Sequence, residues 1–198
     1  KMKQLILLLC LFQATVLSAA EQQHWLAKFQ DQDELFSIDG YRLLRYRSPT
    51  PDQAEGAQTI GTAELKQMLG QASPPALVNV QPIRWQHGHF LQNEPFLHIP
   101  GSRWIPNVGM GELDAGWEDY FRHHLKLATK NQQSARVVLY CRADCWMSWN
   151  AVKRAASWGY NQLFWYKDGV DGWRDAGYEL RAGTPEPYPV RAHERIYN

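Results

Sequence analysis

The chain has 198 residues, which is enough for one domain of ordinary size and an extension. Its 21 basic and 20 acidic residues give a formal net charge of +1, so no long-range field gathers nucleic acid or anionic lipid. Hydrophobic residues make up 44% of the chain, which predicts a packed core and excludes a wholly disordered protein.

The first twenty residues have the pattern of a secretory signal peptide. Lys1 and Lys3 provide a charged start, an apolar run covers 5–12, and small residues end at Ala20. The run is shorter than the roughly 20 residues that cross a bilayer. We therefore expect cleavage after Ala20, export and no membrane attachment after cleavage.

The cysteines outside the predicted signal peptide lie in one short loop. Cleavage would remove Cys10 and leave Cys141 and Cys145. In an oxidising compartment, two thiols in one short loop are candidates for a redox couple, a static disulfide or half of a metal site. The histidine pairs at 87–89 and 123–124 come without a C-x-x-C-like motif, so we predict no metal. An inactive loop that binds a partner also stays open.

Residues 21–56 form a polar N-terminal extension. The pattern predicts a helix near 24–29 and a strand over 41–46, and the turn-rich run 48–52 closes the segment. Two roles stay open for the extension, an edge strand of the sheet or a partner surface.

Short apolar runs and helical patterns alternate along the rest of the chain. The apolar runs predict buried strands at 76–80, 136–140 and 163–166. Apolar spacing predicts helices from Thr62, as the N-cap, to Gly70, from about 117 to 128, and from the cysteines to Gly159. This order favours an α/β domain with a mainly parallel sheet flanked by helices, followed by an extended tail from residue 183.

The cysteine loop lies between a predicted strand and a predicted helix. The strand over 136–140 ends directly before Cys141, and the helix follows Cys145. In a βαβ unit, ligands gather at the carboxyl ends of the strands. The loop is therefore the candidate reactive centre.

Three separated segments resemble the rhodanese, or sulfurtransferase, superfamily. Residues 98–106, HIPGSRWIP, are similar to its HIPGA…IP segment; residues 77–81, LVNVQ, to its LIDVR strand; and residues 160–180 to its closing region. The resemblance implies a rhodanese-like domain over 57–182, between the extension and a tail over 183–198. His98 is expected to be a packing residue.

A narrower resemblance concerns residues 143–150, ADCWMSWN, together with Trp165-Tyr166. They resemble the hallmark of the PQQ-dependent catabolism-associated CXXCW motif proteins, although three residues separate the cysteines here, giving CxxxCW. The resemblance implies a periplasmic companion of PQQ-dependent alcohol oxidation, with a quinoprotein dehydrogenase or cytochrome c as partner. No motif for the quinone is recognisable, so we predict no cofactor.

The rhodanese resemblance also implies roles within the loop. Cys141 takes the position of the nucleophile, with backbone amides from Arg142 to Trp146 stabilising an anionic intermediate above a helix N-terminus. The family has a cation five residues after its cysteine, where this chain has Trp146. Charge on Asp144 would raise a neighbouring thiol's pKa and Arg142 would oppose it. The substrate-binding loop is predicted to consist of Arg142, Ala143, Asp144, Trp146, Met147 and Ser148.

Two hypotheses follow. In the first, the protein is an enzyme for sulfur transfer or thiol–disulfide exchange with a small sulfur donor or thiol, in which Cys141 attacks and Cys145 resolves. In the second, it is a non-catalytic accessory module that docks on a quinoprotein dehydrogenase or cytochrome c through its aromatic loop. The paired thiols favour the first, and the missing cation favours the second.

Overall fold

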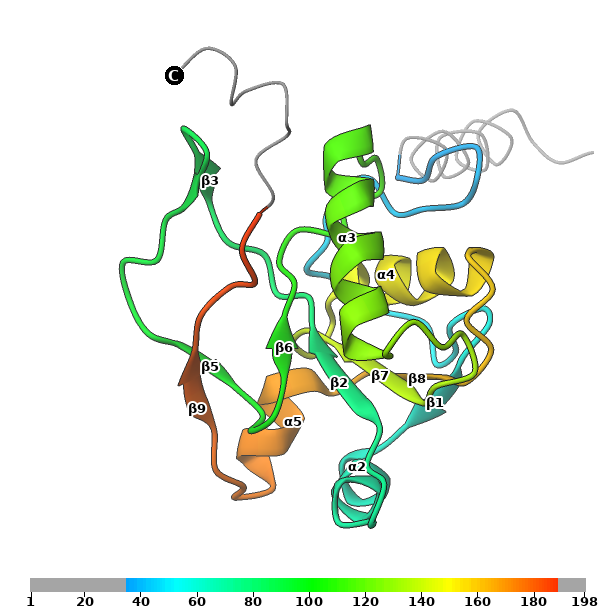
Figure 1. Ribbon diagram of the computed structural model, residues 1–198, viewed down its shortest axis with the longest axis vertical. Coiled ribbons are helices and arrows are strands. Elements are labelled where there is room, and N and C mark those ends of the chain that lie inside the picture. Colours follow the sequence, from blue (N-terminus) through cyan, green and yellow to red (C-terminus); the bar gives the residue numbers. More distant parts are fainter. Residues whose placement is uncertain (1–34, 189–198) are drawn as a thin grey trace, which may run out of the picture. The chain divides into compact units, whose positions relative to one another are not determined.

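The computed structural model describes residues 35–188, and a five-stranded sheet lies at its centre (Figure 1). All its strand pairs are parallel, in the order β1 (Gln58–Ile60), β8 (Leu163–Tyr166), β7 (Val137–Tyr140), β2 (Ala76–Asn79) and β6 (Arg103–Trp104). The three strands predicted from buried apolar runs are its three inner strands. The predicted α/β class is therefore confirmed, whereas the signal peptide and the helix at 24–29 lie outside the described residues.

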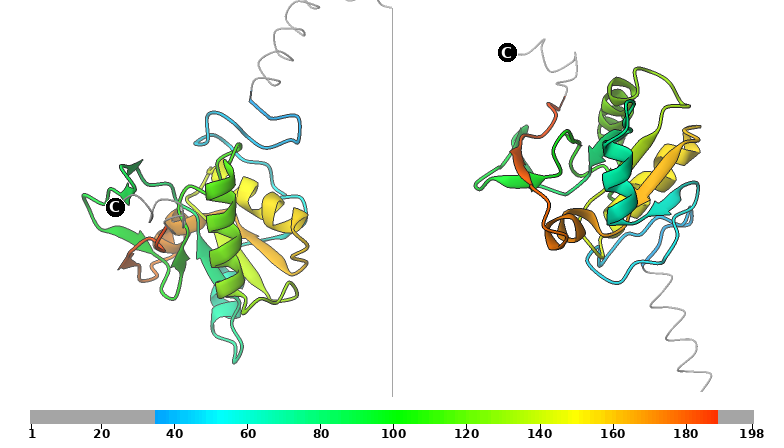
Figure 2. Two further views of the ribbon diagram at one scale, coloured as in Figure 1. Left: turned by 45° about the horizontal axis from the view of Figure 1, so that its top comes forward. Right: turned by 90° about the horizontal axis from the view of Figure 1, so that it is seen from below.

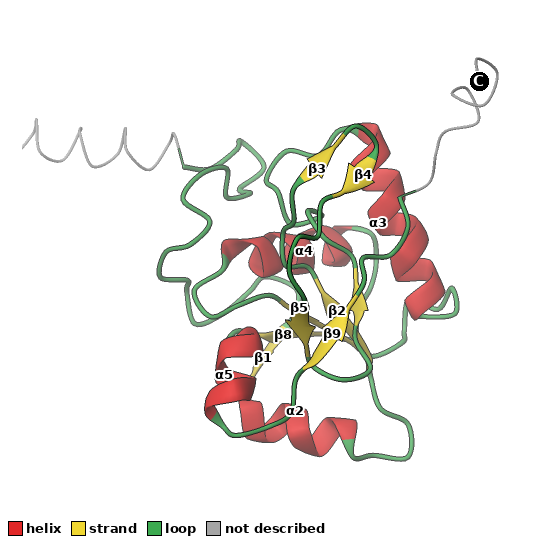
Figure 3. Cartoon of the chain, turned by 90° about the vertical axis from the view of Figure 1, so that its left-hand side faces the viewer, coloured by secondary structure: helices red, strands yellow, loops and turns green. Residues whose placement is uncertain are grey.

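Helices cover both faces of the sheet (Figures 2 and 3). They are α2 (Thr62–Leu69), α3 (Ala115–Ala128), α4 (Trp146–Ser157) and α5 (Gly169–Asp175). On β7, Val137 and Leu139 pack in the core cluster with α3 and α4. Val138 and Tyr140 pack in a second cluster with α2 and α5. All four β7 side chains are buried, because successive residues of a strand point to opposite faces.

Two helix starts differ from the prediction. Thr62 is the first residue of α2 rather than its N-cap, which is Gly61. The Thr62 hydroxyl forms a 2.8 Å hydrogen bond with that of Tyr166 on β8. Helix α3 begins two residues early, because the Asp114 side chain accepts a hydrogen bond from the Trp117 amide.

The predicted strand over 41–46 is wrong. Arg42 forms one isolated antiparallel pairing with Phe36, and Arg47 forms another with Cys145. Between them Arg45 has a φ of 51°, which breaks an extended strand. We call residues 35–56 the N-terminal segment.

Two small antiparallel pairs lie outside the central sheet. A hairpin joins β3 (Trp85–Gln86) to β4 (His89–Phe90), and β5 (Phe96–His98) pairs with β9 (Arg181–Gly183). After β9 the tail continues beside β6, where the Glu186 amide donates to the Trp104 carbonyl at 2.8 Å. Of the predicted tail, Gly183 belongs to β9 and residues 184–188 form no helix. Within residues 35–188, every helix is too short or too polar to cross a membrane.

Asn150 fastens the N-terminal segment to α4. Its side-chain oxygen accepts from the Arg42 amide at 2.9 Å, and its side-chain nitrogen donates to the carbonyls of Arg42 at 2.8 Å and Gly109 at 2.9 Å. Asn150 is fully buried, so water cannot replace these bonds. Gly109 allows the close approach, since a Cβ there would meet the Met147 carbonyl oxygen.

Replacing Asn150 by alanine is expected to lower the free energy of unfolding by about 2–3 kcal/mol, because buried backbone groups lose their partners. Urea denaturation measures the change. The matched variant Asn161→Ala removes an exposed asparagine and is expected to shift stability by less than about 0.5 kcal/mol. Equal effects of the two substitutions would contradict the role given to Asn150.

Candidate functional site

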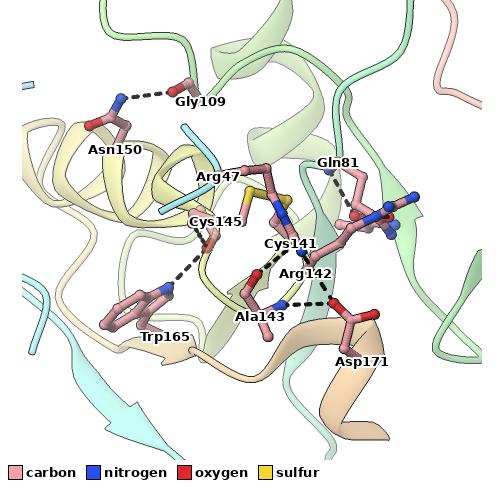
Figure 4. The surroundings of a disulfide bond; sticks show 12 residues. Arg47, Gln81, Gly109, Cys141, Arg142, Ala143, Cys145, Asn150, Trp165 and Asp171 are labelled. Carbon is pink, nitrogen blue, oxygen red and sulfur yellow. Dashed lines mark hydrogen bonds and ion pairs between the residues drawn. A yellow bond between two sulfur atoms is a disulfide. The ribbon is translucent and has the colours of Figure 1, made fainter. Parts of the chain in front are cut away.

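The two cysteines of the loop are joined in a disulfide (Figure 4). Cys141 directly follows β7, and Cys145 is the N-cap of α4. Their Cα atoms are 6.2 Å apart, inside the range that a disulfide requires. Asp144 has a φ of 50°, a left-handed conformation that aspartate tolerates and that turns the chain just before Cys145. The structure therefore leaves the redox couple and the static disulfide as the two interpretations of the pair.

Both cysteines are buried, with exposed fractions of 1% for Cys141 and 3% for Cys145. The N-terminal segment lies along the loop in the antiparallel pairing of Arg47 with Cys145. The Trp146 amide donates to the Tyr46 carbonyl at 2.9 Å, and the Ser48 amide donates to the Asp144 carbonyl at 3.2 Å. A segment that is remote in sequence thus forms part of the site.

Arg47 and Asp171 hold the middle of the loop from outside. A guanidinium nitrogen of Arg47 donates to the Ala143 carbonyl at 2.7 Å and lies 3.8 Å from the Asp171 carboxylate. The same carboxylate oxygen accepts from the Ala143 amide at 3.1 Å (Figure 4). Neither side chain could be predicted from the sequence, because both contact the loop through its backbone atoms.

These contacts engage two of the backbone amides that were predicted to stabilise an anionic intermediate. The Ala143 amide donates to Asp171 and the Trp146 amide to Tyr46, so neither is available to an anion in this conformation. The prediction that backbone amides stabilise an anionic intermediate therefore applies only to the amides of Arg142, Asp144 and Cys145. As the N-cap, Cys145 lies where the positive end of the α4 dipole favours a thiolate.

Trp146 occupies the place of the expected cation and anchors the N-terminal segment. Its indole nitrogen lies 3.0 Å from the Ser48 hydroxyl oxygen and 3.2 Å from the Pro49 carbonyl, and donates to both. The Arg42 guanidinium stacks 4.8 Å from the centre of the ring. Trp149 donates in the same way to the Gln53 carbonyl at 3.0 Å. Both tryptophans therefore pack against the chain's own segment.

The predicted substrate-binding residues divide into two groups. Arg142 and Asp144 are exposed, and Ala143 is half-buried. Met147 and Ser148 are buried in the first turn of α4, where the Ser148 hydroxyl donates to the Cys145 carbonyl. They face the core because the helix already begins at Trp146, so the surface part of the loop is limited to 142–144. Among residues 35–188, no group of three or more His, Cys, Asp or Glu side chains converges as metal ligands would.

His98 is a packing residue, as expected, but only one of its ring nitrogens has a partner. The Asn79 side-chain oxygen accepts from the Gln81 amide, so its nitrogen must be the group that faces His98 Nδ1. Nδ1 is therefore the acceptor, and the proton lies on Nε2, which is buried without a hydrogen-bond partner among the described residues. Burial lowers the pKa of His98 to about 4.

Comparison with known proteins identifies the domain. The model of the rhodanese-like domain family matches residues 62–176. A thiosulfate sulfurtransferase from Pseudomonas aeruginosa is 14% identical with a TM-score of 0.49, covering 70% of this chain and 22% of that one. This chain thus spans about a fifth of that protein. A rhodanese-like domain from Anabaena sp. is 17% identical with a TM-score of 0.44, covering 68% of this chain and 91% of that one. No curated protein matches.

The close packing of α5 on the loop depends on Gly169. It has a φ of 56°, and a Cβ there would lie 2.4 Å from the Cys141 carbonyl oxygen. Gly169→Ala is expected to destabilise the fold by more than the ~1–2 kcal/mol that a left-handed alanine costs, because the loop must also move. Gly177→Ala is the matched control, since Gly177 has a φ of 76° and open space around it. Equal losses in thermal unfolding would contradict the close contact.

His98 makes the fold sensitive to mild acid. The unfolded chain binds a proton at His98 below pH ~6.5, but the folded protein does so only below about pH 4. Stability is therefore expected to fall by about 3 kcal/mol as the pH is lowered through this window. Urea titrations from pH 7.5 to 4 measure this slope, which His98→Gln should reduce and His87→Gln, at an exposed site, should leave unchanged. An unchanged slope in His98→Gln would refute the assignment.

Proposed function

The chain belongs to the rhodanese-like domain family, and we propose that it performs sulfurtransferase-type thiol chemistry at Cys141 and Cys145. The observation that carries this proposal is the disulfide within the loop, at the carboxyl end of β7, an inner strand of the parallel sheet. Ligands of α/β proteins gather at this edge. The disulfide adds a second oxidation state to a loop that would otherwise hold one nucleophile.

In the proposed cycle, the Cys141 thiolate attacks a sulfur donor or a small disulfide. With thiosulfate as donor, Cys141 becomes a persulfide and sulfite leaves. Cys145 then attacks Cys141, so that the intramolecular disulfide forms and hydrosulfide is released. With a small disulfide, the first product is a mixed disulfide, and attack by Cys145 releases the second thiol.

Reduction runs in the opposite direction. An external thiolate attacks Cys141 Sγ, and Cys145 leaves as a thiolate. Its place as the N-cap of α4 makes it the better leaving group, since the helix N-terminus stabilises negative charge. A second thiol then attacks the mixed disulfide and releases the oxidised product, which leaves two protein thiols. These electrostatics support the assignment of Cys141 as the sulfur that an external thiolate attacks.

We propose that the chain is exported to the periplasm and accompanies PQQ-dependent alcohol oxidation, beside a quinoprotein dehydrogenase or cytochrome c. Export is supported by the charged, apolar and small-residue pattern of residues 1–20. The association is supported by the likeness of the CxxxCW loop to the CXXCW motif. An oxidising periplasm would also regenerate the disulfide.

A second candidate function is a non-catalytic accessory module. It is favoured by the burial of both cysteines and by Trp146, which anchors the N-terminal segment where the family has a cation. In that case the disulfide is a structural cross-link that fixes the shape of a docking surface.

Trapping the intermediate separates these two functions. Reduced Cys145→Ser, incubated with oxidised glutathione, is expected to accumulate a mixed disulfide on Cys141, because the resolving thiol is absent. Intact-mass measurement should show it forming at least about tenfold faster than any adduct of Cys141→Ser. Thiosulfate in place of glutathione should leave one added sulfur on Cys141 and one released sulfite.

The wild-type protein is the control, since it should return to the intramolecular disulfide without a stable adduct. Absence of an adduct on Cys145→Ser with both reagents would support the accessory module. Faster modification of Cys141→Ser would contradict the assigned roles.

A further inference from the structure

A pocket of about 270 Å³ lies beside the cysteine loop. Arg142 of the loop lines it, together with Val170, Asp171 and Arg174 of α5 and the chain at the start of β5. Its volume corresponds to roughly nine liquid waters. The pocket therefore suits a small molecule rather than a peptide.

Two opposite charges in this pocket are not neutralised by the protein. Asp171 and Arg174 form an ion pair at 2.8 Å. Within residues 35–188, by contrast, Arg142 forms no ion pair, and the Glu94 carboxylate has neither an ion pair nor a hydrogen bond. The pocket thus offers one guanidinium and one carboxylate to a ligand.

A buried polar group next to Arg142 also lacks a partner. The Gln81 side chain is 2% exposed and lines the pocket, and its oxygen accepts from Arg142 Nε at 3.0 Å. Its amide nitrogen has no hydrogen-bond partner among the described residues. Figure 4 shows Gln81 and Arg142 side by side next to Cys141. A ligand carboxylate that pairs with the guanidinium would therefore bind next to a second, unpartnered donor.

The remaining walls are apolar. Phe96, Val170 and Leu180 line the pocket, so the short aliphatic part of a small charged molecule can be buried against them. The ligand chemistry is therefore a small zwitterion with an acidic end at Arg142 and an ammonium at Glu94. Arg142 directly follows Cys141 in the chain, so such a ligand binds next to the cysteine loop, although neither cysteine lines the pocket.

We propose that this pocket binds the head group of a cysteine-like thiol, with an ammonium and a carboxylate, as reductant of the Cys141–Cys145 disulfide. This inference rests on the proposed function and specifies its co-substrate. The bound thiolate attacks Cys141 Sγ, Cys145 leaves as a thiolate, and a second thiol releases the disulfide of the small molecule. For the bound thiolate to reach Cys141 Sγ, which is buried, the pairing of the N-terminal segment with the loop must loosen, including the hydrogen bond from Arg47 to the Ala143 carbonyl.

The rate of disulfide reduction tests the proposal. The oxidised protein is mixed with cysteine, 2-mercaptoethanol, cysteamine or 3-mercaptopropionate, quenched by alkylation and analysed by mass. Rates are compared per thiolate, because the four thiols differ in pKa. We expect cysteine to be about tenfold faster than 2-mercaptoethanol, the gain of two modest ion pairs. The two singly charged thiols should fall between them.

Substitutions in the pocket test whether the preference for cysteine over 2-mercaptoethanol arises there. Arg142→Gln and Glu94→Gln are each expected to remove about two-thirds of the preference for cysteine, as expected for the loss of one modest ion pair. The quantity compared is the ratio of the cysteine rate to the 2-mercaptoethanol rate within each variant, so that any effect of a substitution on the disulfide chemistry itself cancels. Arg84→Gln and Glu112→Gln, at exposed positions outside this pocket, should keep the full preference.

Two outcomes are distinguishable. Equal rates with cysteine and 2-mercaptoethanol would overturn the zwitterion pocket, while the thiol chemistry would stand. A preference that survives in Glu94→Gln, with 3-mercaptopropionate as fast as cysteine, would also overturn it. A disulfide that none of the four thiols reduces would instead reject the proposed function.

Discussion

The pairing of the N-terminal segment with the cysteine loop is the interaction on which the site depends. Two backbone hydrogen bonds, from Trp146 to Tyr46 and from Ser48 to Asp144, join segments about a hundred residues apart. The Trp146 indole adds its hydrogen bonds to the same segment. Both cysteines are buried beside this pairing. The Trp146 amide, which could otherwise bind an anion, donates to the Tyr46 carbonyl. Any chemistry at Cys141 therefore requires this pairing to loosen locally.

The inner part of the fold could be predicted from sequence because its signal is strong. Strands buried on both faces appear as continuous apolar runs, and the runs at 76–80, 136–140 and 163–166 lie within one residue of the observed strands. The segment at 41–46, YRLLRY, is interrupted by two arginines, and its backbone bonds to the Asn150 side chain and to loops instead of a strand. The hairpin at His87-Gly88 was missed, because its turn uses positive φ at both residues, and histidine there is an unusual signal.

The cysteine pair of the candidate site could be predicted from the sequence, but its surroundings could not. Two cysteines in one short loop after a strand indicated the candidate site, and the structure joins them in a disulfide. The sequence could not reveal that Asp171 occupies the Ala143 amide or that Arg47 binds the Ala143 carbonyl, since such contacts to backbone leave no pattern. Sequence also placed Met147 and Ser148 in the surface loop, whereas α4 begins at Trp146 and buries both.

In the proposed function, the Cys141–Cys145 disulfide is a redox couple that is reduced and reformed, and not a structural cross-link. The most direct measurement is its reduction potential, obtained by equilibrating the protein in defined dithiol buffers and counting alkylated cysteines by mass. The account predicts half-reduction at a potential above about −300 mV, as for labile or catalytic disulfides. A disulfide that stays mostly oxidised at about −300 mV and below would contradict the claim and identify a structural cross-link.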